Sequence, residues 1–356
     1  MKIKLGKKII SNNSKTYFIA DIAANHDGKI SRAKKLIRLC AKAGANAAKF
    51  QHFKAETIVS DAGFRSLGKI AHQKKWKKSV FEIYKEASIN PSWNIILKKE
   101  CKKNRIDYMT APYDLDYVDE VKKDIVAYKI GSGDITWKKI IKKISKKKKP
   151  VIIATGASSL KDVNRAIKTI LKLNPIKPVL MQCNTNYNNS KENLNYLNLN
   201  VLNQYKKIFK DKVILGLSDH THGHVSVLAA VALGARVVEK HFTDSNSRFG
   251  PDHKFSMNPV SWAKMVNDVR ILESALGDGK KKIENNEKQS VIVQRRGAWL
   301  NRKVKKGDIL KEDMIDYLRP CPNNSIDIFE IHKYLGKKFI KSFKKDTLIT
   351  VKCLRK

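Results

Sequence analysis

The sequence predicts an α/β fold, a (β/α)8 TIM barrel followed by a small C-terminal domain of short strands and turns. Eight short apolar runs alternate with amphipathic helical stretches, which is the pattern of βα units in a parallel sheet. These units end near residue 280, in agreement with the roughly 250 residues typical of a barrel. Most of the runs also end in polar side chains, as expected where catalytic groups come from several strand ends.

The predicted strands are short and separated by helices. They span residues 17–22, 47–50, 108–110, 127–130, 151–154, 179–183, 213–217 and 236–238. The main predicted helices span residues 31–43, 92–103, 160–173, 197–209, 225–235 and 259–276. The first of these ends at Gly44, as a helix C-cap should. Residues 61–88 form a long insertion after the second strand, which we expect to lie over the active face and to shape substrate choice.

Composition places the end of the barrel domain at residue 280, a linker at 281–290 and a second domain at 291–356. Gly277, Asp278 and Gly279 precede a charged stretch in which hydrophobic periodicity is lost. The second domain contains short apolar runs separated by turns. A unit of about 65 residues is small for independent stability, so we expect it to pack against another surface.

The net charge of +40 would suit a nucleic-acid-binding protein, because phosphate contacts dominate such binding. The lysines, however, are spread along the whole chain, without an aromatic stacking platform, helix-turn-helix or zinc-finger spacing. We therefore expect no nucleic-acid partner. The positive charge can still assist the capture of anionic substrates.

Two further features concern location and redox state. The chain has no run of eighteen apolar residues, and residues 1–8 lack the apolar core of a signal peptide, so we expect a cytoplasmic protein without a membrane partner. The five cysteines are scattered and include no Cys-x-x-Cys pair. They predict neither a disulfide framework nor a cysteine zinc site.

Two histidines follow successive strand-like runs, His220 after residues 213–217 and His241 after residues 236–238. The C-terminal ends of neighbouring parallel strands converge above a barrel, and imidazole binds divalent transition metals, including manganese when oxygen ligands complete the shell. The alternative is that both histidines only make hydrogen bonds at strand ends. Asp252 follows soon after and is available as a metal ligand or for sugar hydroxyls.

An anion site is indicated by Lys49 and Lys129, which lie inside otherwise apolar runs, so that each favours a buried anionic partner. Ser132, Thr110 and the backbone N–H groups of residues 131–133 complete a site suited to a small phosphate or carboxylate.

Together these residues carry a resemblance to the sialic acid synthase family, phosphoenolpyruvate-dependent enzymes that make nine-carbon 2-keto-3-deoxy sugar acids. The matching segments occur in family order, at residues 19–21, 25–28, 47–51, 128–134, 218–221, 239–242 and 250–253. The C-terminal domain is similar to the antifreeze-like (SAF) domain of this family, on segments 295–296, 306–308, 318–320 and 335–338.

The resemblance implies roles for particular residues. A divalent metal, manganese with magnesium or cobalt as alternatives, would bind His220 and His241. Phosphoenolpyruvate would be held by Lys49, Thr110, Lys129, Ser132, Thr185 and Ser218. The amino-sugar acceptor would be held by Gln51, Tyr187 and Asp252. The family also forms homodimers with exchanged antifreeze-like domains, so Arg319 would act in the partner's active site.

Acid/base catalysis is assigned first to Asp21 and second to Asp134. Asp21 occupies a position where much of the family has glutamate, and its side chain is shorter by one methylene. This difference affects either the acid/base role of the residue or the identity of the acceptor sugar. Residues 183–187 are Cys-Asn-Thr-Asn-Tyr, whereas Cys-Thr-Ser-x-Tyr is more usual in the family. Residues 81–87 and Trp93 resemble the pseudaminic acid branch, whereas residues 131–134 resemble the sialic and legionaminic branches.

The sequence thus predicts a transferase that condenses phosphoenolpyruvate with N-acetylmannosamine or a related N-acetylated hexosamine, giving a nonulosonic acid and phosphate. A legionaminic or pseudaminic acid synthase, which uses a 2,4-diacetamido-trideoxyhexose, is the nearest alternative. Two others are a metal-dependent aldolase that uses pyruvate and a basic binding protein built on an inactive barrel.

Overall fold

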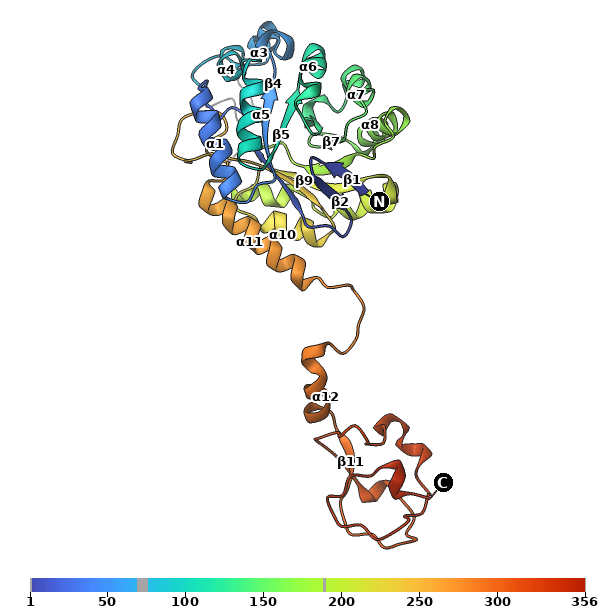
Figure 1. Ribbon diagram of the computed structural model, residues 1–356. Coiled ribbons are helices and arrows are strands. Elements are labelled where there is room, and N and C mark those ends of the chain that lie inside the picture. Colours follow the sequence, from blue (N-terminus) through green and yellow to red (C-terminus); the bar gives the residue numbers. More distant parts are fainter. Residues whose placement is uncertain (1, 69–75, 188–189, 356) are drawn as a thin grey trace. The chain divides into compact units, whose positions relative to one another are not determined.

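The computed structural model describes residues 2–68, 76–187 and 190–355, so part of the predicted insertion, residues 69–75, lies outside the described residues. The chain divides into two compact units, Met1–Gly277 and Asp278–Lys356. The first unit contains a closed barrel of eight parallel strands surrounded by helices (Figure 1). The predicted (β/α)8 fold is therefore confirmed.

The barrel strands follow one another around the ring in chain order, and the last pairs with the first. They are β3 (Tyr17–Asp21), β4 (Ala47–His52), β5 (Asp107–Pro112), β6 (Tyr128–Ile130), β7 (Val151–Ala154), β8 (Val179–Cys183), β9 (Ile214–Asp219) and β10 (Val237–His241).

Side chains on each strand alternate between the barrel interior and the helix layer. On β5, Met109 belongs to the interior cluster, whereas Tyr108 packs with the helices. On β3, Ile19 points inward and Phe18 outward. Because both faces are buried, the strands are nearly continuous apolar runs, and a polar side chain on the inner face near a strand's C-terminal end reaches the cavity described below.

An N-terminal hairpin that the sequence did not predict comprises β1 (Lys2–Leu5) and β2 (Lys8–Ser11), joined through Gly6. Leu5 and Ile10 are buried in the same cluster as the barrel interior. The hairpin also borders residues 125–126 and 149–150, which precede β6 and β7. It therefore lies at the N-terminal ends of the strands, opposite the catalytic face of a barrel.

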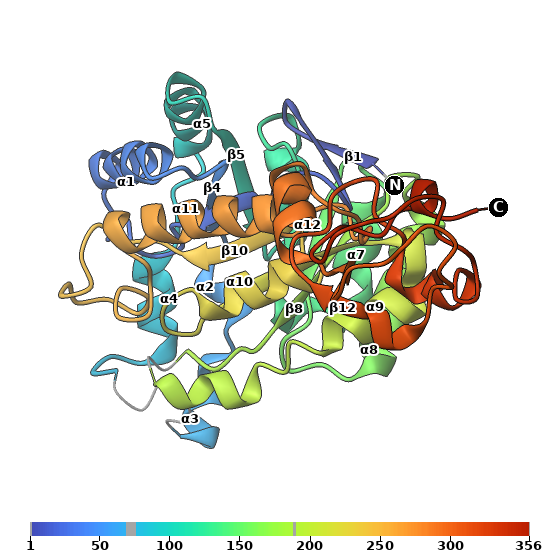
Figure 2. The ribbon, with the colours of Figure 1, turned by 90° about the horizontal axis from the view of Figure 1, so that it is seen from below.

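The helices form the outer layer and an insertion. They are α1 (Ile30–Lys42), α2 (Ala55–Ile58), α3 (Asp61–Leu67), α4 (Val80–Ala87), α5 (Trp93–Lys103), α6 (Leu115–Glu120), α7 (Lys138–Ser145), α8 (Leu160–Leu173), α9 (Val201–Phe209), α10 (Val225–Ala232) and α11 (Pro259–Ala275). Helix α8 shows why they form: a capping box of Ser159 and Asp162 starts it, and Val163, Ile167 and Ile170 bury one face. Helices α10 and α11 pack against each other, and α10 also packs against β9; both helices can be followed in Figure 2.

The C-terminal unit has a small core of its own, which includes Leu300, Val304 and Phe339. Its regular elements are α12 (Lys288–Gln294), β11 (Gly297–Leu300) and β12 (Ile315–Leu318), and the two strands pair antiparallel. Residues 281–290, predicted as a linker, include the 3-10 turn Asn285–Glu287 and the start of α12. In the described part of the chain, no helix is long and apolar enough to cross a membrane.

Candidate active site

A cavity of about 410 Å3 lies at the C-terminal ends of the barrel strands. Most of the residues predicted for the site line it. They are Asp21, Lys49, Gln51, Lys129, Ser132, Asp134, Tyr187, Ser218, His220, His241 and Asp252. The cavity therefore unites residues from all eight barrel strands or the loops that follow them, as barrel active sites do.

Two lysines and two carboxylates form a buried charge cluster in this cavity. Lys49 Nζ lies 2.6 Å from Asp21 Oδ2 and 3.4 Å from Glu239 Oε1. Lys129 Nζ lies 3.2 Å from the same Glu239 oxygen. All four side chains are at most 5% exposed. Because both lysines already pair with carboxylates, an incoming anion would bind beside lysines that have partners.

Glu239 is a candidate functional residue to which the sequence argument assigned no role. Burial alone would raise its pKa, but Lys129 and Lys49 outweigh burial and hold the pKa at about 2. Ser218 Oγ donates to Oε1 at 3.3 Å, whereas Oε2 has no hydrogen-bond partner among the described residues. The sequence did contain a signal for Glu239. A carboxylate inside a buried strand needs a charged partner, just as the two buried lysines do.

Asp21, the leading acid/base candidate, is almost fully buried. Burial raises its pKa, an effect that Lys49 opposes and Glu239 reinforces. Gln51 Nε2 donates to Asp21 Oδ2 at 3.2 Å, and the Ala23 N–H donates to Oδ1 at 3.1 Å. In the structure Gln51 thus holds Asp21, whereas its predicted role was to hold the sugar.

The two histidines meet as the sequence predicted, with ring centroids 5.4 Å apart. His220 Nδ1 lies 2.9 Å from the Asn184 carbonyl oxygen, which accepts its N–H and leaves the Nε2 lone pair available. His241 Nδ1 is buried without a hydrogen-bond partner in the described structure. Burial, with the neighbouring His241, lowers the pKa of His220 to about 4, and burial together with Lys49 lowers that of His241 to about 3.

These observations fit a divalent metal ion. Both imidazoles are neutral near pH 7, which is the form that binds a metal. Asp252 Oδ2 lies 3.9 Å from the orphaned His241 Nδ1, and Asp21 Oδ2 lies 3.6 Å from Nε2. Within the described residues no group of three or more His, Cys, Asp or Glu side chains is arranged to hold an ion. The metal therefore remains a prediction, with water or substrate oxygens expected to complete the shell.

Aromatic rings pack around the histidines. The Phe255 ring centroid lies 4.9 Å from that of His241, and the Tyr187 centroid lies 4.4 Å from that of His220. Phe255 and Tyr187 also contact each other at 5.4 Å. An apolar surround of this kind would limit water access to a metal ion if the two histidines bind one. No sequence motif pointed to Phe255, because an apolar residue in a loop has no distinctive pattern.

Three predicted site residues lie elsewhere. Thr110 faces the helix layer: its Oγ1 donates to the Phe50 carbonyl at 2.9 Å and lies 2.7 Å from His52 Nδ1. Its predicted contact with phosphoenolpyruvate is therefore corrected, since alternation along β5 turns its side chain away from the cavity. Thr185 is half-buried next to Gly156 and does not line the cavity.

Arg319 belongs to the C-terminal unit. Its Nε donates to the Gln294 carbonyl oxygen at 2.5 Å, and the side chain is exposed. Its predicted action in a partner's active site remains a prediction.

The outer part of the cavity has an apolar wall. It is contributed by the connection between β4 and α5, as expected for the insertion, and consists of Phe53, Ile58, Trp76, Ile83, Tyr84 and Ala87. Asp134 and Asp252 also line the cavity. Burial raises the pKa of Asp134 to about 6. Burial raises that of Asp252 to about 7, although the Ala24 N–H opposes the shift.

Comparison with known proteins agrees with this geometry. Residues 36–281 match the NeuB family. The chain is 34% identical over 351 residues to an N,N'-diacetyllegionaminic acid synthase of Campylobacter jejuni, covering 94% of this chain and 99% of the relative. It is 29% identical over 336 residues to a pseudaminic acid synthase of the same species, covering 94% and 95%. A sialic acid synthetase from Leptospira borgpetersenii superposes with a TM-score of 0.70 at 26% identity, covering 82% of this chain and 95% of that one. The protein therefore belongs to the NeuB family.

Proposed function

We propose that the protein is a transferase that condenses phosphoenolpyruvate with the open-chain aldehyde of an N-acetylated hexosamine, giving a nonulosonic acid and phosphate. The observation that carries this proposal is that two buried lysines and two buried, neutral histidines line the same cavity. The family supports it, because the two relatives from Campylobacter are named as synthases of such acids.

Phosphoenolpyruvate carries a phosphate and a carboxylate, so it needs more than one cation. Lys49 and Lys129 would each bind one of these groups, with Ser132 and the backbone around it contributing hydrogen bonds. Ser132 Oγ already accepts the Gly156 N–H at 2.9 Å, which fixes its position. The same lysines would then stabilise the negative charge of the departing phosphate.

The reaction balances as follows. C3 of phosphoenolpyruvate forms a bond to the aldehyde carbon, whose oxygen takes up a proton, and water adds at C2. Phosphate leaves from the resulting tetrahedral centre, and C2 becomes the ketone. Asp21, whose pKa burial raises, would take a proton from the attacking water or give one to the aldehyde oxygen, and Asp134 is the second candidate. A divalent ion held by His220 and His241 would supply Lewis-acid polarisation of the aldehyde oxygen.

The test is phosphate release from phosphoenolpyruvate in the presence of an N-acetylated hexosamine and a divalent metal, with the product mass determined. We expect release of one phosphate per sugar acid formed. Turnover of pyruvate instead would favour an aldolase. If no substrate turns over but nucleic acid binds tightly at physiological salt, the basic binding protein on an inactive barrel would be favoured.

The apolar wall favours the 2,4-diacetamido-trideoxyhexose over N-acetylmannosamine as acceptor. Ile58, Ile83 and Ala87 offer no hydrogen bond to a terminal hydroxyl, whereas they suit a methyl group and acetamido methyls. We expect kcat/KM to favour the trideoxy sugar by about ten- to a hundred-fold, the discrimination an apolar pocket can provide against an added hydroxyl. A panel of both sugars measures this, and equal kcat/KM values would contradict it.

We further propose that the active enzyme is a homodimer in which Arg319 completes the partner's active site. Mixing an Arg319→Ala subunit with a His220→Ala subunit should then restore activity, because a mixed dimer has one barrel with intact histidines that receives Arg319 from its partner. Random exchange makes about half of the dimers mixed, so about a quarter of wild-type activity should return. Proven subunit exchange without activity would show that Arg319 works within its own chain or has no catalytic role.

Asp134 should set the acidic limb of the pH profile. Because its pKa is raised to about 6, its deprotonated form accumulates as the pH rises through that value. If it acts as a base, kcat/KM should rise over the same range, and Asp134→Asn should remove this limb. Comparing the variant with wild type on the same substrates cancels the titration of the substrates themselves. An unchanged limb in Asp134→Asn would assign it to another group.

A further inference from the structure

The connection between β10 and α11 forms one side of the active site. This loop, residues 243–258, has no helix or strand, yet it supplies Pro251 and Asp252 to the cavity and packs Phe255 against His241. Loops of this length without regular structure are uncommon in compact domains unless they serve a function, and this one must be held by side-chain bonds. Its hydrogen bonds therefore decide where Asp252 stands.

The two ends of the loop are fixed by backbone bonds. The Met257 N–H donates to the His241 carbonyl at 2.8 Å, and the Thr243 N–H donates to the Met257 carbonyl at 2.9 Å. Within the loop, Asn246 Nδ2 donates to the carbonyl oxygens of Ser256 at 2.6 Å and His253 at 2.9 Å. The loop is thus closed on itself, but these bonds do not attach it to the rest of the catalytic face.

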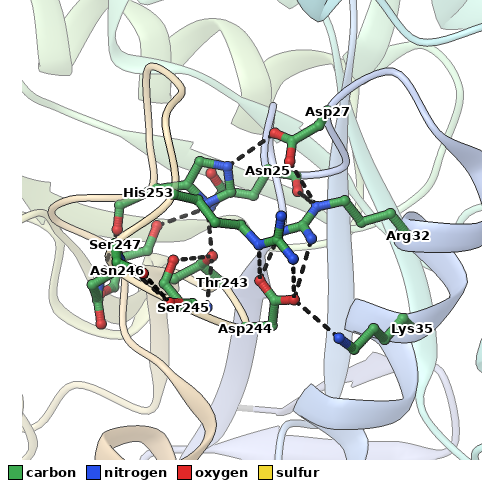
Figure 3. A network of polar contacts seen from close by, with 12 residues as sticks. Asn25, Asp27, Arg32, Lys35, Thr243, Asp244, Ser245, Asn246, Ser247 and His253 are labelled. Atoms are coloured by element: carbon green, nitrogen blue, oxygen red, sulfur yellow. Dashed lines mark hydrogen bonds and ion pairs between the residues drawn. The ribbon is translucent and has the colours of Figure 1, made fainter.

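His253 is one of the side chains that attach it to the loop after β3 (Figure 3), where Asn25 Nδ2 also donates to Ser256 Oγ at 2.9 Å. The His253 ring is fully buried, with Nε2 2.9 Å from Asp27 Oδ1 and Nδ1 2.7 Å from Thr243 Oγ1. Arg32 Nε lies 2.8 Å from Asp27 Oδ2, and its terminal nitrogens lie 2.6 and 3.2 Å from the two Asp244 oxygens. Two carboxylates, one from each loop, therefore share one nearly buried guanidinium.

The bonds of His253 and Arg32 determine the position of Asp252. The His253 ring lies among Asp27 and Thr243, whereas the Asp252 side chain lines the cavity. Asp252 Oδ2 accepts the Ala24 N–H at 3.2 Å, and its carbonyl accepts the Ser256 hydroxyl at 2.6 Å. Hydrogen bonds that hold the His253 ring in place therefore also fix the position of the neighbouring Asp252 carboxylate.

Gly250 shows how closely the loop is fitted to this ring. A Cβ atom there would stand 2.7 Å from His253 Cδ2, and its φ of 154° belongs to the region that favours glycine. The backbone therefore approaches His253 more closely than a residue with a side chain would allow.

We propose that His253, through its bond to Asp27, is a positioning residue for the acceptor sugar. This inference rests on the proposed function, in which Asp252 contacts the sugar. The candidate ligands of phosphoenolpyruvate that line the cavity lie on β4, on β6 and the turn after it, and on β9, all outside this loop. A loosened loop should therefore weaken binding of the sugar and spare phosphoenolpyruvate.

The test is His253→Phe, which keeps a ring and removes both hydrogen bonds. KM for the acceptor should rise about tenfold, the usual cost of losing a hydrogen bond to a charged group, while KM for phosphoenolpyruvate stays within about twofold of wild type. The matched control is His224→Phe, because His224 Nε2 makes a comparable bond of 2.7 Å to Asp268 outside the loop. It should change neither KM.

Asp27→Ala provides a second variant that keeps the buried His253 ring and removes only its partner, a side chain that is 30% exposed. It should reproduce the rise in acceptor KM, and the double variant should cost less than the sum of the two single changes. Hydrogen–deuterium exchange should increase in residues 243–258 of both variants and remain unchanged in the barrel strands. This readout needs no turnover, so it separates failure of the positioning role from failure of the proposed reaction.

Equal rises in both KM values, or unchanged exchange in the loop, would overturn the positioning role. So would additive effects of the two substitutions.

Discussion

Replacing His220 or His241 with alanine is expected to abolish turnover and leave the barrel folded. Both rings line the cavity, and each pKa lies well below 7, so both imidazoles are neutral and available to a metal. Metal polarisation of a carbonyl is worth several kcal/mol, so activity should fall below about 1% of wild type. Activity assays and circular dichroism of the two variants measure this.

A direct metal readout separates this expectation from a general loss of function. Wild type should bind manganese in a titration, and the two variants should not. His332→Ala is the matched control, because His332 is an exposed histidine of the C-terminal unit and should alter neither binding nor turnover. Full activity in excess chelator, or in either active-site variant, would contradict the metal assignment.

Loss of either cavity lysine should weaken the binding of phosphoenolpyruvate far more than the binding of the sugar. In Lys49→Ala or Lys129→Ala, KM for phosphoenolpyruvate should rise about ten- to a hundred-fold, since a charge-assisted contact is worth about 1.5 to 3 kcal/mol. KM for the acceptor should change little, because the acceptor carries no anionic group that needs these cations. Steady-state kinetics with each substrate varied in turn measures the split.

Stability must be controlled in this experiment. Lys129 and Glu239 are both buried and lie 3.2 Å apart, so removing the lysine leaves a carboxylate with less compensation and lowers the free energy of unfolding. The double variant Lys129→Met with Glu239→Gln removes both charges. It should regain stability over the single variant while phosphoenolpyruvate remains weakly bound. Equal weakening of both substrates in the single variants would show that the lysines only support the fold.

Lys49 and Lys129 could be predicted as site residues because the signal lies in their immediate sequence neighbours. Each lies inside an apolar run, and a charge in such a run requires a charged partner wherever the chain folds. Lys240 shows the limit of this argument. It is also buried in a strand, yet it faces the helix layer and pairs with Asp219 at 2.6 Å. Burial could be read from the sequence, but the face of the strand could not.

Thr110 was misplaced for the same reason. In a strand buried on both faces, neither set of alternating side chains is more polar, so the sequence pattern does not reveal which set points inward. The register of β5 against β4 decides it, and Met109, not Thr110, points into the barrel. The hairpin β1–β2 escaped prediction because two strands of four residues are too short to show a period.

The sequence alone determined the barrel, the converging histidines and most of the cavity, because hydrophobic alternation and strand-end polar residues are properties of neighbouring positions. Tertiary structure decided which oxygen each lysine meets, that Glu239 joins both, and that His253 ties its loop to Asp27, a residue 226 positions earlier. The physical reason is that hydrogen bonds act within about 3 Å and close ion pairs within about 4 Å, and only the closed ring of strands brings residues so distant in sequence to that separation.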